Sequence, residues 1–170
     1  HSFHMFVPPQ VDQLVQAAGI QGHKVVGRQG IGGSRVIQHW ELTEAKDKTG
    51  KVTNRQTAKP ALETGEVDVF TMAAHLQIPD DGITNFTELG LKHNPNLRLL
   101  VQESWYPFDI PRGSPGFITD NAQRDDAKIA DLQAAVDDWR KKLEAQADDL
   151  NKQHGRRAVF IVPVCDAVVK

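Results

Sequence analysis

The sequence has one cysteine, one tyrosine and no long apolar run among its 170 residues. A single cysteine, Cys165, excludes a disulfide within the chain and a cysteine-based zinc cluster. Its place in an apolar run predicts a buried thiol. No apolar stretch is long enough to span a membrane as a helix. The net charge of −2 gives no indication of attraction to nucleic acid or to a membrane surface.

What remains is the composition of a soluble globular domain. Hydrophobic residues make up 39% of the chain and charged residues 25%, which is typical of a protein with a sizeable core. The length fits one domain, so we expect residues 1–170 to form a single unit. The start, from His1 to Met5, lacks the charged and apolar regions of a signal peptide. A cytoplasmic and a mature exported location both stay open.

Segments with helical and with strand-like patterns alternate along the chain. Helical spacing of apolar residues occurs in 11–18, 34–40, 56–64, 79–93 and 124–155, and β-rich runs occupy 23–27, 67–72, 97–101 and 159–162. This alternation predicts an α/β fold, specifically a three-layer α/β/α, flavodoxin-like domain with a parallel sheet. The polar residues 44–54 predict a surface excursion, and the proline- and glycine-rich residues 107–120 predict an irregular loop.

A glycine-rich turn follows the first predicted strand. Gly30, Gly32 and Gly33 precede Ser34, which is placed to cap the next helix. Glycines permit a positive φ and let backbone N–H groups face a ligand, so such a turn suits an anion or a developing oxyanion. Ordinary strand–helix junctions carry glycines as well, so a structural role stays open.

The predicted topology brings four chain segments together. Ligands of open α/β sheets bind beyond the carboxyl ends of the strands. Those ends carry residues 27–34, 73–75, 103–105 and 163–166, so we expect these segments to line one rim. His75 is the histidine that we expect to have a polar role there. Trp105 and Tyr106 either line a pocket at the rim or pack under the proline-rich loop.

This order of segments resembles the SGNH (GDSL-type) hydrolases, which are esterases and acetylhydrolases with a flavodoxin-like sheet. Gly32-Gly33-Ser34-Arg35, with Gln38 to Glu41 after it, resembles their second block, whose glycine N–H helps to bind the oxyanion. Residues 1–6 resemble the stretch after the nucleophile block, and residues 67–75 take the place of the third block. The resemblance implies hydrolysis of a small ester, such as an acetyl group on a carbohydrate, without a metal or cofactor. It assigns oxyanion or ligand binding to Gly32, Gly33 and Ser34.

The sequence also departs from that family's pattern. It contains no Gly-Asp-Ser or Gly-Asn-Ser, no Gly-x-Asn-Asp in the third block, and no Asp-x-x-His at Asp166. A serine hydrolase needs a nucleophile, a base and an orienting acid within hydrogen-bond reach. We therefore expect a catalytically incomplete domain that lacks the first strand and the final block. Ser2 is the nearest candidate nucleophile, and His75 or Gln77 is the candidate replacement for the third block's side-chain donor.

Two other functions remain open. Without a triad, the chain would be an inactive binding or assembly module, and its unpaired sheet edges predict a homo-oligomer. Alternatively, the amino group and imidazole of His1 could bind copper together with His4, His39 or His75. The known oxidases with an N-terminal histidine are β-sandwiches, however, and this sequence alternates helices with strands. We expect a small-molecule ester as ligand, and neither nucleic acid nor a membrane as partner.

Two further features favour structural roles. The carboxylate pairs Asp80-Asp81 and Asp125-Asp126 stand at predicted helix starts, where free N–H groups and the helix dipole favour negative charge. His39 lies next to Trp40 on a short predicted helix, so we expect it to pack or cap locally.

Overall fold

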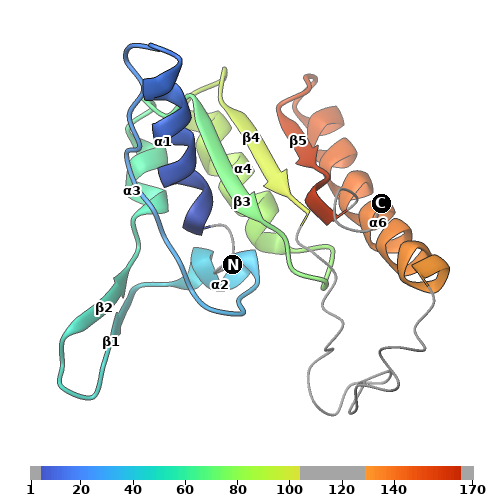
Figure 1. Ribbon diagram of the computed structural model, residues 1–170, viewed down its shortest axis with the longest axis horizontal. Helices are drawn as coiled ribbons and strands as arrows, with labels where there is room; N and C mark the ends of the chain where they lie inside the picture. Colours follow the sequence, from blue (N-terminus) through green and yellow to red (C-terminus); the bar gives the residue numbers. More distant parts are fainter. Residues whose placement is uncertain (1–4, 104–128, 166–170) are drawn as a thin grey trace.

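The fold is known from a computed structural model that describes residues 5–103 and 129–165. In chain order its elements are α1 (Val7–Ala17), α2 (Val36–Glu41), β1 (Glu44–Lys46), β2 (Val52–Arg55), α3 (Ala58–Glu63), β3 (Val69–Ala73), α4 (Asp81–His93), β4 (Arg98–Gln102), α6 (Ile129–Gln153) and β5 (Val159–Val162). The strands form a parallel sheet of β3, β4 and β5 and a separate antiparallel hairpin of β1 and β2 (Figure 1).

The parallel sheet confirms the predicted α/β fold class. Val69 of β3 pairs with Arg98 of β4, and Leu99 of β4 pairs with Val159 of β5. The spatial order of the strands follows the chain, so right-handed crossovers place α4 and α6 on the same face of the sheet. The described residues contain three parallel strands. The flavodoxin-like arrangement of a larger sheet therefore stays a prediction.

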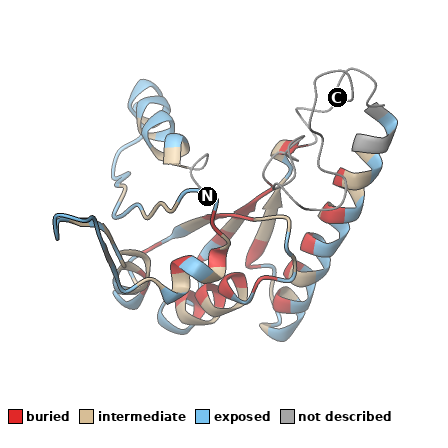
Figure 2. Cartoon of the chain, turned by 90° about the horizontal axis from the view of Figure 1, so that it is seen from below, coloured by how far each residue is buried: buried red, intermediate tan, exposed pale blue. Residues whose placement is uncertain are grey.

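The core lies between the sheet and helices α4 and α6. Its buried side chains come from all three elements: Leu99 and Val101 from β4, Ile83, Phe86 and Leu91 from α4, and Val136, Trp139, Leu143 and Leu150 from α6. The last four belong to the apolar stripe that the sequence predicts for the long helix. Figure 2 shows the buried residues gathered on this side of the sheet.

The prediction of a strand at residues 23–27 is wrong. These residues adopt no secondary structure, and Val26 is 53% exposed. A β-rich run becomes a strand only when a neighbouring strand pairs with its backbone, and no described strand pairs with this segment.

Helix α1 is confirmed as a helix, and Gly19 follows it with a φ of 68°. It contributes no buried residue, however, and Leu14 is 69% exposed. The two views show α1 on the side of the sheet opposite α4 (Figures 1 and 2). Its predicted apolar face is therefore largely uncovered by the described residues.

The predicted surface excursion at residues 44–54 is the β1–β2 hairpin. Asp47 holds the turn, because its Oδ1 accepts hydrogen bonds from the backbone N–H groups of Thr49 and Lys51. The helix predicted at 56–64 is α3, and Gly65 follows it with a positive φ of 72°. Among the described helices, none is long and apolar enough to cross a membrane.

Candidate functional site

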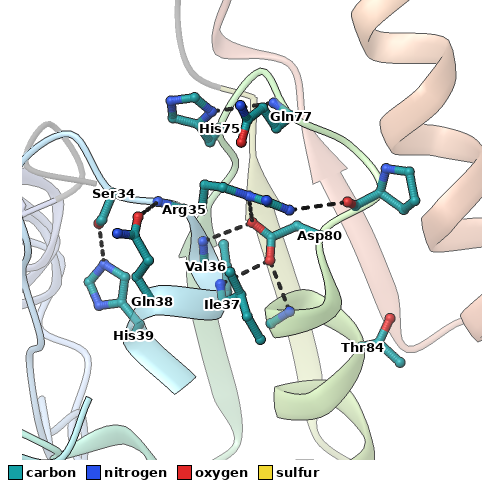
Figure 3. Close-up of polar contacts among 12 residues, drawn as sticks. Ser34, Arg35, Val36, Ile37, Gln38, His39, His75, Gln77, Asp80 and Thr84 are labelled. Atoms are coloured by element: carbon teal, nitrogen blue, oxygen red, sulfur yellow. Dashed lines mark hydrogen bonds and ion pairs between the residues drawn. The ribbon is translucent and has the colours of Figure 1, made fainter. Parts of the chain in front are cut away.

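The start of α2 and the loop after β3 lie side by side at the carboxyl end of β3. Figure 3 shows the Arg35 side chain reaching toward Asp80 and Val36 lying beside the Asp80 carboxylate, whereas Ser34 points to His39. The guanidinium of Arg35 donates to the carbonyl of Pro79 over 3.4 Å. The residue that follows the glycine turn thus contacts the segment after β3, although no strand precedes the turn.

Asp80 joins these two segments. Its carboxylate is fully buried and accepts hydrogen bonds of 2.9 Å from the backbone N–H groups of Val36, Ile37 and Gly82. It therefore satisfies N–H groups at the starts of α2 and α4 at once. The Nε of Arg35 lies 3.5 Å from the same carboxylate. The expected structural role of Asp80 at a helix start is confirmed. Its hydrogen bonds to a second helix, α2, were not predicted from the sequence.

The prediction that Ser34 caps the helix after the glycine turn is wrong. The N-cap residue of α2 is Arg35, and the first N–H groups of the helix bind the carboxylate of Asp80 instead. A charged acceptor makes the stronger hydrogen bond here, so the serine hydroxyl is left for other partners. Ser34 is 2% exposed.

Ser34 and His39 form a buried pair whose hydrogen bonds run in the direction unsuited to nucleophile activation. The Ser34 hydroxyl donates to the carbonyl of Ile31 and lies 2.8 Å from Nε2 of His39. The single proton of the Ser34 hydroxyl is engaged with Ile31, so Nε2 of His39 donates to the Ser34 oxygen. The Nδ1 of His39 then accepts from the side-chain amide of Gln29 over 3.4 Å. Burial lowers the pKa of His39 to about 4, which keeps this ring neutral. The pair supports the turn, as expected for a locally packed His39.

His75 is half-buried at the end of β3. Its Nδ1 accepts from the backbone N–H of Gln77 over 3.3 Å, which places the ring proton on Nε2. Its carbonyl accepts from the indole of Trp139, so the loop is tied to α6. Burial, and after it the positive charge of Arg35, lowers the pKa of His75, while Asp80 opposes the shift. At neutral pH the side chain is a neutral N–H donor.

The charge of Arg35 gives a test of this geometry. Replacing Arg35 with glutamine removes a cation that disfavours the imidazolium, so the pKa of His75 is expected to rise. An NMR titration of the imidazole resonances measures the change. Arg98→Gln removes the same charge at the opposite end of β4 and serves as the control. An unchanged or lower His75 pKa in Arg35→Gln would show that the two side chains do not interact.

The glycine turn is open above Gly32 and Gly33. A Cβ built on either residue would meet no atom within 4 Å, whereas one on Gly30 would collide with the side chain of Met5. Of these glycines, Gly33 has a positive φ, 61°. Within the described part of the chain, no group accepts from the N–H of Gly32 or Gly33. These N–H groups are available to a ligand.

Gly82 marks a close approach of the backbones of α2 and α4. A Cβ on this residue would overlap backbone atoms of Val36 and Ile37, so Gly82→Ala must push the two helices apart. We expect the variant to lose about 2 kcal/mol of unfolding free energy, the usual cost of overpacking. Gly32→Ala meets open space and is expected to change stability by less than about 0.5 kcal/mol. Equal urea midpoints for the two variants would contradict this contact.

Of the remaining predicted site residues, Ser2, Trp105 and Tyr106 lie outside the described residues, as do His1, His4 and the loop 107–120. Cys165 is buried, as predicted. Within the described ranges, no three histidine, cysteine, aspartate or glutamate side chains gather as a metal site. The sequence interpretation missed Glu103, a fully buried carboxylate at the end of β4.

A shallow groove lies away from this rim. Its volume is about 410 Å³, and Trp40, Asn85, Glu88, Leu89 and Lys92 line it. The ammonium of Lys59 lies 3.9 Å from the centre of the Trp40 ring, so part of that aromatic face is already occupied.

No protein-family model, curated protein or solved structure matches the chain.

Proposed function

We propose that this chain is an ester-hydrolase-like domain of the SGNH type that binds a small ester at the carboxyl end of β3. The observation that carries the proposal is the double contact of Asp80, which joins the start of α2, directly after the glycine turn, to the start of α4, directly after the loop that carries His75. The glycine turn and the His75 loop are the two segments to which the resemblance assigns oxyanion binding. The rim of a parallel sheet is also where ligands of α/β domains bind.

The chemistry of the rim suits a carbonyl that gains negative charge. Gly32 and Gly33 offer N–H groups that no described residue uses, and His75 adds a neutral Nε2–H donor. The guanidinium of Arg35 adds positive charge to the same side of the molecule. Preorganised donors of this kind stabilise the tetrahedral intermediate of acyl transfer more than they stabilise the ground-state ester.

The nucleophile in this proposal is Ser2. Its Oγ would attack the ester carbonyl carbon and form an acyl-enzyme, the alcohol would leave with a proton, and water would then release the acid. Ser34 is unsuited to this step, because its hydroxyl is buried and donates to Ile31. The proton transfers require a base from outside the described residues.

Fluorophosphonate labelling tests the proposal. The purified chain is treated with the reagent, the labelled peptide is mapped, and p-nitrophenyl acetate hydrolysis is followed in parallel. We expect the label on Ser2, lost in Ser2→Ala and kept in Ser34→Ala, with ester turnover slower than that of a serine hydrolase with a complete triad. A folded sample that neither reacts nor hydrolyses the ester would contradict the esterase proposal.

A catalytically inactive binding module is the second candidate. It is favoured by the one serine–histidine contact in residues 5–103 and 129–165, in which the histidine donates rather than accepts. Such a module would bind a small ester or amide at the same rim and leave it intact. Binding without turnover separates it from the esterase.

We also propose that the chain forms a homo-oligomer by pairing the edge of β3 with a second copy of itself. Strand β3 has one neighbour, β4, within the described sheet, and Val69 on this strand is 50% exposed. An unpaired strand edge is a template for pairing with another chain. Sedimentation velocity tests this homo-oligomer, since a monomer at all concentrations would contradict it.

A further inference from the structure

Besides the groove at Trp40, the structure has a shallow polar cleft beside the β1–β2 hairpin. This hairpin projects away from the parallel sheet (Figure 1). The volume of the cleft is about 270 Å³. Arg28, from the extended segment before the glycine turn, forms one side. Residues 52–55 and Thr57 form the other, so two parts of the chain far apart in sequence meet here.

Hydrogen bonds hold the two sides of this cleft together. The Thr57 hydroxyl donates to the carbonyl of Arg28 over 3.2 Å, and the Thr57 N–H donates to the side-chain oxygen of Gln29 over 2.9 Å. The side-chain amide of Asn54 donates to the carbonyl of Gly30. The cleft is therefore formed before any ligand arrives, which lowers the entropic cost of binding.

The hairpin beside the cleft carries an excess of positive charge. Residues 44–57 carry four basic and two acidic side chains, although the whole chain has a net charge of −2. Both acids are engaged locally: Glu44 lies 3.0 Å from Lys46, and Asp47 accepts the hydrogen bonds of the hairpin turn. Arg55 is 4.0 Å from Glu44, a distance at which an exposed ion pair is weak.

Arg28 has no counter-ion within the part of the chain that the structure describes. No carboxylate in the described ranges lies within ion-pair distance of its guanidinium, which is exposed. A guanidinium presents a planar fork of donors that matches the geometry of phosphate, sulfate and carboxylate groups. The residues that line the cleft include no aromatic side chain on which a nucleic-acid base could stack.

We propose that this cleft binds a single anionic group of a ligand, namely a phosphate, sulfate or carboxylate, between Arg28 and Arg55. The proposal does not depend on ester hydrolysis at the end of β3, because it rests on a different set of residues. The ligand is a polar small molecule that bears such a group, and the neutral groups of the cleft contact its remaining atoms.

Titrations with inorganic phosphate, sulfate and acetate test the proposal. They are followed by NMR at constant ionic strength, with chloride as the balancing anion. We expect saturable shifts of the Arg28 and Arg55 side-chain signals and of the Thr57 amide for at least one of these anions. The double variant Arg28→Ala/Arg55→Ala is expected to weaken that binding at least about tenfold. Both side chains are exposed, so the fold is expected to persist.

A matched control separates a site from general attraction. Lys141→Ala/Lys152→Ala removes the same two positive charges from exposed positions on α6 and should leave the affinity unchanged. Arg28→Lys keeps the charge but loses the planar fork, and is expected to give an intermediate affinity. The proposal is overturned if none of the anions saturates the wild-type chain, or if the two double variants lose the same affinity.

Discussion

Replacing Asp80 with alanine is expected to lower the free energy of unfolding by about 4 kcal/mol. The carboxylate is fully buried, and its loss leaves the N–H groups of Val36, Ile37 and Gly82 without their acceptor. It also leaves the buried Nε of Arg35 without the anion beside it. Urea unfolding followed by circular dichroism measures the change.

The neighbouring carboxylate provides the control for this prediction. Asp81 is exposed in the first turn of α4, so Asp81→Ala removes the same charge and is expected to cost less than about 1 kcal/mol. Asp80→Asn keeps one acceptor oxygen and should fall between the two alanine variants. A loss in Asp80→Ala no larger than that in Asp81→Ala would rule out the shared cap.

Acid is expected to destabilise the protein through His39. Burial lowers the pKa of His39 in the folded chain from 6.5 to about 4, so below pH 6.5 the unfolded chain binds a proton that the folded chain does not. The unfolded state therefore gains stability as the pH falls, and this effect levels off below about pH 4. This difference in the pKa of His39 corresponds to a loss of about 3 kcal/mol in the free energy of unfolding.

Urea unfolding of the wild type and of His39→Gln between pH 7 and pH 4 measures this effect. Glutamine does not titrate, so the variant should lose less stability than the wild type over this range. His93→Gln, which changes an exposed histidine at the end of α4, is the control and should follow the wild type. Parallel curves of unfolding free energy against pH for the wild type and His39→Gln would show that protonation of His39 does not cause the loss of stability in acid.

The elements of the parallel sheet could be predicted from sequence because their signals are local. The runs at 67–72, 97–101 and 159–162 are apolar and end at turns, and they form β3, β4 and β5 within two residues of the predicted limits. The prediction at 23–27 used the same signal and is wrong. A local pattern does not reveal whether another strand lies close enough to pair with the run.

The contact that organises the site could not be predicted from sequence. Asp80 stands 44 residues from Val36, and a carboxylate at a helix start has the same pattern whether it caps one helix or two. The error at Ser34 has the same origin, because a distant carboxylate took the N–H groups that a local hydroxyl was expected to bind. The position of His75 just after a strand could be predicted, because the β-rich run at 67–72 is a local signal.

A titration with N-ethylacetamide tests the central claim, that Gly32, Gly33 and His75 together form a site for a small acyl group. This neutral amide has the shape of ethyl acetate and resists hydrolysis, so binding is measured without turnover. We predict that the backbone amide signals of Gly32 and Gly33 and the His75 imidazole signals shift together along one saturation curve. Shifts confined to the groove beside Trp40, or none at all, would contradict the account.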